Sequence, residues 1–266
     1  MTGNMAQGDA YLRSRQLARR AVELDPDLSL ARTVLARIHF QYEWDWPAAQ
    51  SEFDRALELD PNDAATLNMY GAYRVMVHAE REEGLSLLKR ARDRDPFNRG
   101  LHFDLGVYSF HCRQYDESIR HLAQVSELTP EFAFPRLMLA WNYAQKGWND
   151  KAVRQCDEAI EEAKNRFDHG VLSSCAWVNG LAGRPDVAAR LVSRLEQAPT
   201  GVRVDPVYLS WGCIAVEDFD CAIEQLEKAL RQRSSTMVFL RVAPGWDPLR
   251  NDPRFEAILE EMDFPA

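Results

Sequence analysis

The chain has 266 residues, of which 46% are hydrophobic and 27% charged, so it has ample apolar material for a folded core. Its formal net charge of -9 disfavours nucleic acid as a partner, because an acidic surface repels a phosphate backbone. The five cysteines are an odd number without a CxxC pair, which argues against a disulfide framework or a zinc knuckle and predicts a reducing, cytoplasmic compartment.

The first segment, residues 1–26, is predicted to be a lead-in with one helix at about 9–25. Met1–Asp9 has neither the basic start nor the apolar centre of a signal peptide. No later stretch approaches the roughly 18 apolar residues of a membrane span. We therefore expect a soluble chain.

Four prolines then recur with nearly constant spacing. Pro26, Pro61, Pro96 and Pro130 are 35, 35 and 34 residues apart, and they close the similar phrases AVELDP, ALELDP, ARDRDP and VSELTP. Twelve residues before each proline stands a small residue: Ser14, Ala49, Gly84 or Ser118. Small residues let two helices approach closely, and a proline cannot continue a helix. The spacing predicts helix pairs at 29–61, 64–96 and 99–130.

Later units keep the small residues and lose the proline. Gly147 and Gly183 stand 36 residues apart at the turns between helices, and each is followed five residues later by an alanine. These units predict helix pairs at 133–164, 169–198 and 203–234, which complete an array over 27–234. The tail 235–266 is not a repeat. We expect it to be a cap, in which residues 237–240 and a helix at 253–262 cover the last apolar face. No segment alternates with period two, so the chain is predicted to be all-α.

The offsets closely resemble the tetratricopeptide repeat (TPR), a helix-turn-helix unit of about 34 residues. The resemblance implies a right-handed superhelical α-solenoid of antiparallel helix pairs with a C-terminal capping helix. Residues 42–61 and 238–255 further resemble the repeat arrays of bacterial signalling proteins, in which a DNA-binding or adenylate-cyclase domain precedes the array. This sequence contains neither domain, so that resemblance implies at most a sensing or docking role.

In this family the first helix of each unit lines a concave groove. The resemblance therefore predicts a partner- or ligand-binding face that is mixed in its N-terminal half and aromatic in its C-terminal half. Large apolar patches and tryptophans are typical of interaction sites. The alternative is that the rings pack against one another or beneath the tail. The predicted groove residues are Arg37, Phe40, Gln41, Asn68, Met76, Phe103, Phe110, His111, Trp141, Gln145, Trp177 and Trp211.

Catalytic and metal-binding signatures are missing from the sequence. It has no GxxxxGK[ST], GxGxxG, HExxH or GxSxG motif, and its six histidines are dispersed over different units. Cys156 and Cys175 occupy packing positions of predicted helices, so we expect buried structural thiols. We predict no enzyme activity, cofactor or metal.

The leading hypothesis is a protein-interaction scaffold that holds a partner segment in the groove. Chaperone-docking relatives clamp a carboxylate, but of the comparable residues here only Arg37 and Asn68 suit that task. An extended peptide or a hydrophobic small molecule fits better. The alternatives are a ligand-sensing receptor module and, below it, an enzyme of unrecognised type. Nothing in the sequence fixes an oligomeric state.

Overall fold

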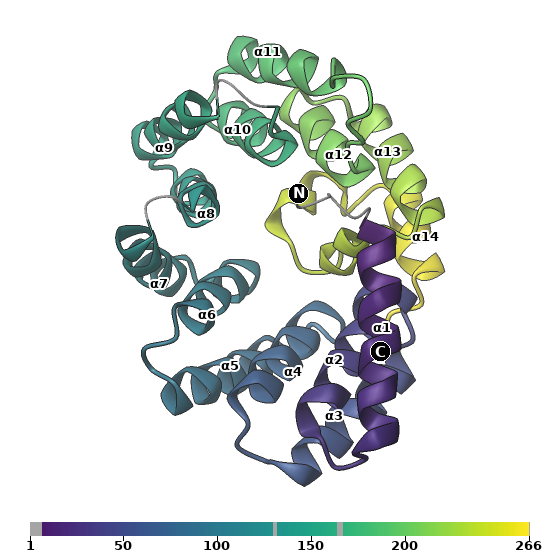
Figure 1. Ribbon diagram of the computed structural model, residues 1–266. Helices are drawn as coiled ribbons and strands as arrows, with labels where there is room; N and C mark the ends of the chain where they lie inside the picture. The colour runs from purple at the N-terminus through teal and green to yellow at the C-terminus, as the bar shows by residue number, and fades with distance from the viewer. Residues whose placement is uncertain (1–6, 130–131, 164–166, 266) are drawn as a thin grey trace. The chain divides into compact units, whose positions relative to one another are not determined.

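The computed structural model describes residues 7–129, 132–163 and 167–265 (Figure 1). All regular structure within these ranges is helical, without a strand, which confirms the expected all-α solenoid of neighbouring helix pairs. A lone helix, α1 (Gln7–Leu24), precedes the pairs. They are α2 (Ser29–Ile38) with α3 (Trp46–Leu59), α4 (Ala64–Met76) with α5 (Arg81–Arg94), α6 (Arg99–His111) with α7 (Tyr115–Leu128), α8 (Ala133–Gln145) with α9 (Asn149–Glu162), α10 (His169–Leu181) with α11 (Pro185–Glu196), and α12 (Pro206–Ala215) with α13 (Phe219–Arg231).

Helix ends follow the local signals of the sequence. Pro26, Pro61 and Pro96 each stand two residues after the last residue of α1, α3 or α5. The Asp63 carboxylate accepts the backbone N–H of Thr66 at the start of α4, and Asp205 accepts that of Val207 at the start of α12. Such caps satisfy backbone donors that have no partner inside the helix. Pro130 and residues 1–6, to which predictions also applied, lie outside the described residues.

Small residues bring the two helices of a pair together, as the repeat pattern predicts. A methyl group added at Gly71 of α4 would stand 2.8 Å from the carbonyl oxygen of Gly84 in α5. In the next pair the Ser118 hydroxyl of α7 donates a hydrogen bond of 2.7 Å to the carbonyl of Gly106 in α6. Close backbone approach and tight packing between partners are thus set by these positions.

The chain divides into two compact units. The first contains the described residues up to Leu101 together with Phe264 and Pro265, and the second contains His102–Asp263. In the first unit, an aromatic core of Phe40, Phe53 and Tyr73 has ring centroids 5.4–6.2 Å apart. The expected lead-in, array and cap stay a prediction.

The cysteines differ in part from the expectation. Cys213 at the end of α12 and Cys221 in α13 form a disulfide, with their Cα atoms 5.8 Å apart. The short turn between these helices brings the two residues together, although the odd number of cysteines and the lack of a CxxC pair argued against a disulfide framework. Cys112, Cys156 and Cys175 are not in a disulfide and are buried.

The second unit ends with two 3-10 turns, Ser235–Phe239 and Pro244–Leu249, followed by α14 (Pro253–Glu261). We call residues 235–249 the covering segment. Within this unit it is the yellow-green chain beside α12 in Figure 1. Among the described residues, no helix combines the length and apolar character needed to cross a membrane.

Candidate functional site

The predicted aromatic face is assembled by three successive first helices of the second unit. Trp141 of α8, Trp177 of α10 and Trp211 of α12 meet edge to face, with ring centroids 5.6 Å apart for Trp141–Trp177 and 4.9 Å for Trp141–Trp211. Phe110 of α6 extends the cluster and lies 5.7 Å from Trp141. Edge-to-face pairs of this kind stabilise a fold beyond the area they bury.

The covering segment lies on these rings. Trp246 packs 5.6 Å from Trp211, and Phe239 packs 4.8 Å from the imidazole of His111. Trp141, Trp177 and Trp246 are only 6%, 5% and 1% exposed, and Trp211 is half-buried. The aromatic face that the sequence predicts therefore already holds an occupant, which is the chain's own tail.

An ion pair fixes one end of the covering segment. Both Nη atoms of Arg113, in the turn after α6, donate hydrogen bonds of 2.8 Å to the two carboxylate oxygens of Asp247. Arg250 donates a further hydrogen bond of 2.8 Å to the same carboxylate. Partial burial alone would raise the pKa of Asp247, but these donors lower it below its ordinary value. The bidentate geometry fixes the orientation of the segment.

His111 lies under Phe239 and is buried, which lowers its pKa from 6.5 to about 3. Below about pH 6.5 the imidazole of His111 binds a proton in the unfolded chain, whereas in the folded chain it stays neutral down to about pH 3. The free energy of unfolding therefore decreases as the pH falls from about 6.5 to about 3. The slope is at most about 1.4 kcal/mol per pH unit. We expect wild type to lose roughly 2 kcal/mol more than His111→Phe between pH 7 and pH 5, measured by urea unfolding. Parallel losses in both proteins would contradict a neutral, buried His111.

The remaining groove residues of the second unit divide into buried and accessible positions. Gln145 of α8 accepts a hydrogen bond of 3.2 Å from the Tyr115 hydroxyl and is half-buried. Phe103, near the start of α6, is also half-buried and packs with Phe132 and Phe134, away from the tryptophans.

Three phenylalanines form an accessible patch at the start of α6 and α8. Phe103 lies 5.7 Å from both Phe132 and Phe134, which are 6.4 Å apart, and we call these residues the phenylalanine cluster. Phe132 is 47% exposed and Phe134 38% exposed. Sequence reasoning selected Phe103 and missed the other two. The signal for them is the phrase EFAF, with two aromatic residues immediately before the periodic part of a first helix.

In the first unit, the predicted groove residues are mostly internal. Phe40 and Met76 are buried to 1% exposure or less, and Asn68 is 6% exposed. Arg37 is exposed and Gln41 half-buried. Only these last two present polar groups to solvent, so the structure gives this half of the predicted groove little accessible surface.

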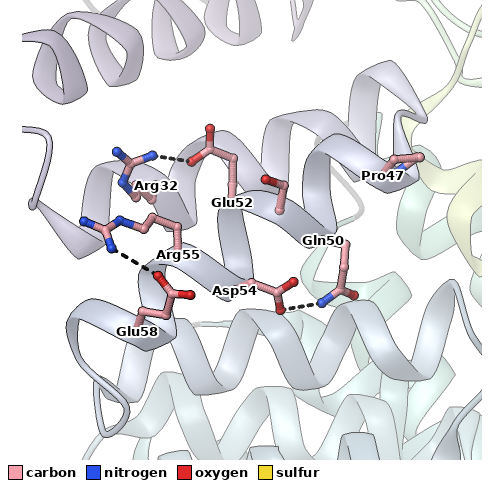
Figure 2. A pocket seen from close by; sticks show the side chains of 8 residues that line it. Arg32, Pro47, Gln50, Glu52, Asp54, Arg55 and Glu58 are labelled. Atoms are coloured by element: carbon pink, nitrogen blue, oxygen red, sulfur yellow. Dashed lines mark hydrogen bonds and ion pairs between the residues drawn. The ribbon is translucent and has the colours of Figure 1, made fainter.

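An open cleft of about 710 Å³ lies along α3 in the first unit (Figure 2). Its charged groups are matched with one another: Arg32 with Glu52, Arg55 with Glu58, and the Gln50 amide with Asp54. A cleft of self-paired charges does not suit the hydrophobic small molecule considered above.

Nucleophilic and metal chemistry find little support in the second unit. Burial raises the pKa of the Cys175 thiol well above its ordinary value, and its Sγ lies 3.7 Å from the carbonyl oxygen of Cys156. A thiol of that kind is not poised to react. Across the described part of the chain, no three His, Cys, Asp or Glu side chains are grouped as metal ligands.

Comparison with known proteins finds no matching family model and no matching curated protein. Solved structures do match. A tetratricopeptide repeat protein from Parabacteroides merdae is 15% identical, with a TM-score of 0.64 over 95% of this chain and 92% of that chain. PilW, a type IV pilus biogenesis factor, is 20% identical, with a TM-score of 0.62 over 76% and 90%. PilF of Pseudomonas aeruginosa is 17% identical, with a TM-score of 0.54 over 93% and 99%. At these identities the likeness concerns the fold alone.

Proposed function

We propose that this chain, which has the tetratricopeptide-repeat fold, is a non-catalytic scaffold that binds a segment of a partner protein at the phenylalanine cluster. The observation that carries the proposal is a contiguous, accessible group of three aromatic rings on neighbouring first helices. Aromatic side chains are enriched at interaction hot spots, and exposed aromatic clusters are uncommon on surfaces without a partner.

The covering segment is the reason to prefer this cluster to the tryptophans. Met237, Val238, Leu240, Val242 and Trp246 are at most 1% exposed. Fully burying such a side chain contributes about 1.5–3 kcal/mol. A partner that displaced the covering segment would have to replace all of these contacts.

The position of the covering segment affects the two partner classes expected from the sequence differently. A protein segment finds an accessible apolar anchor at the phenylalanine cluster. A hydrophobic small molecule would need the tryptophan face that the covering segment occupies. The interaction scaffold is therefore the function we propose, and the receptor alternative has no observation in its favour.

Photo-crosslinking from single positions tests the proposal. A photoreactive phenylalanine analogue at Phe132, introduced in cells that naturally make the protein, is expected to trap one partner reproducibly. The matched control is the same analogue at Phe97, which is 93% exposed and belongs to the first unit. The partner isolated in this way should bind Phe103→Ala/Phe132→Ala at least about tenfold more weakly than wild type. Equal crosslinking from both positions, or unchanged affinity, would reject the cluster as the site.

A cytoplasmic location remains part of the proposal. Some cysteines favour this compartment and others favour an oxidising one. Three cysteines outside any disulfide, Cys112, Cys156 and Cys175, favour a reducing compartment. The Cys213–Cys221 disulfide favours an oxidising one, because disulfides persist mainly outside the cytosol. Thiol alkylation in native cells, with and without prior reduction, measures how much of this pair is oxidised and decides between the compartments.

A further inference from the structure

Helix α1 has the residue pattern of a second helix, yet the described residues supply it with no first helix. The small residue twelve before each proline, or its counterpart in the later units, faces the first helix of its own unit. This position is fully buried in each complete pair, as at Ala49, Ser118, Ala152, Ala188 and Ala222, each 0% exposed. Its counterpart in α1, Ser14, is half-exposed, and so is Ala21, about two helical turns further on. One side of α1 therefore lacks the cover that its equivalents have.

An apolar strip occupies that uncovered side. Leu17 is 63% exposed and Leu24 70% exposed. With 3.6 residues per turn, Ser14, Leu17, Ala21 and Leu24 lie within about 80° of one another on the helix surface. Ala18 is buried against the rest of the first unit. On the side of Ala18 away from the leucines lies Tyr11, whose ring stacks on Tyr42 with the ring centroids 4.7 Å apart. We call the four residues from Ser14 to Leu24 the open strip.

Basic residues border the open strip. Helix α1 contains four arginines against two carboxylates, although the whole chain has a net charge of -9. Arg13 and Arg20 lie next to Leu17 and Leu24 on the helix surface, on the side away from Ala18, and both are exposed. Arg20 forms an ion pair of 2.8 Å with Glu23, but both side chains are more than 60% exposed. An exposed pair of this kind exchanges readily for a better partner.

We propose that the open strip is a second docking site, which accepts an amphipathic acidic helix of a partner protein in the position that a first helix takes in a complete pair. The strip supplies small residues for close approach and leucines for burial, as the complete pairs do. Arg13 and Arg20 select carboxylates along the edge of the incoming helix. The open strip and the phenylalanine cluster share no residue, so either site can fail without the other.

Charge distinguishes this occupant from a second copy of the chain. An antiparallel pairing of two α1 helices through Leu17 would place the arginines of one copy beside those of the other. Like charges across a helix interface oppose association. An acidic helix meets the same leucines with complementary charge, which is why we favour it over self-association.

A pair of synthetic peptides tests the site on the full chain. The probes are helices of about 16 residues with Ala, Gly and Leu on one face, edged either by Glu or by Lys. By fluorescence anisotropy, wild type should bind the Glu peptide at least about tenfold more tightly than the Lys peptide. Arg13→Glu/Arg20→Glu should reverse this preference, and Leu17→Ser/Leu24→Ser should weaken both interactions by at least about tenfold.

The matched control lies on the other flank of the same helix. Leu12 is 50% exposed and Arg19 is exposed, so Leu12→Ser/Arg19→Glu makes equivalent changes outside the open strip and should leave Glu-peptide binding within about twofold. Circular dichroism of each variant checks that it remains folded. Equal affinity for both peptides, or equal losses in the control, would overturn the proposal. So would concentration-dependent dimerisation abolished by Leu17→Ser, or preferential binding to vesicles of anionic phosphatidylserine, because either assigns the strip another occupant.

Discussion

Replacing Trp246 by alanine is expected to lower the free energy of unfolding by about 3–5 kcal/mol. The side chain is 1% exposed, packs on Trp211 and fills the space over the tryptophans of the first helices. Its removal leaves a cavity that the surrounding helices cannot close, and it uncovers the aromatic face. Urea unfolding followed by circular dichroism measures the loss.

Two further variants make this result specific. The indole N–H of Trp246 is buried without a hydrogen-bond partner, so Trp246→Phe keeps most of the ring contacts and should cost clearly less than alanine. Trp148→Ala removes the same side chain from a site that is 41% exposed and should also cost less. A loss below about 1 kcal/mol for Trp246→Ala would show that the covering segment contributes little to the fold.

The second large effect concerns Gly180 in α10, where two first helices meet. A methyl group added there would stand 2.5 Å from the carbonyl oxygen and 3.1 Å from the Cα of Ala215 in α12. These are backbone atoms, so α10 and α12 would have to separate. Alanine in place of glycine favours a helix by about 1 kcal/mol, whereas overpacking costs about 1–3 kcal/mol or more. We therefore expect Gly180→Ala to destabilise the protein in spite of its better helix propensity.

Gly170 in the same helix provides the control. A methyl group there would meet only the Asp168 side chain, at an ordinary contact distance of 3.4 Å. Gly170→Ala should therefore leave the midpoint of thermal unfolding unchanged or raise it, while Gly180→Ala lowers it by several degrees. A higher midpoint for both would contradict the close approach of α10 and α12.

The sequence was informative where packing is periodic. Small residues such as Gly84 and Ser118 recur because each helix pair must approach closely, and that requirement repeats from unit to unit. Helix order, pairing and the ends at Pro26, Pro61 and Pro96 followed from it. Contacts of this kind join neighbours along the chain, so a repeating pattern reveals them.

The candidate site was less predictable because its contacts are not periodic. Arg113 and Asp247 are 134 residues apart, and no repeat relates them. The covering segment consists of 3-10 turns, which leave no amphipathic signal, although the expectation that residues 237–240 cover an apolar face pointed to it. Phe132 and Phe134 stand at the start of α8, where side-chain exposure depends on neighbouring elements and not on helical periodicity.

In the proposed function, a partner segment binds the phenylalanine cluster while the covering segment stays in place. Hydrogen exchange of the full chain, alone and after addition of the partner that crosslinking at Phe132 identifies, tests this most directly. We predict that the partner slows exchange in peptides containing Phe103 and Phe134, and that amides of residues 237–246 stay equally protected in both samples. Faster exchange at residues 237–246 on binding, with no change around Phe103, would instead mean that the partner displaces the covering segment and binds the tryptophans.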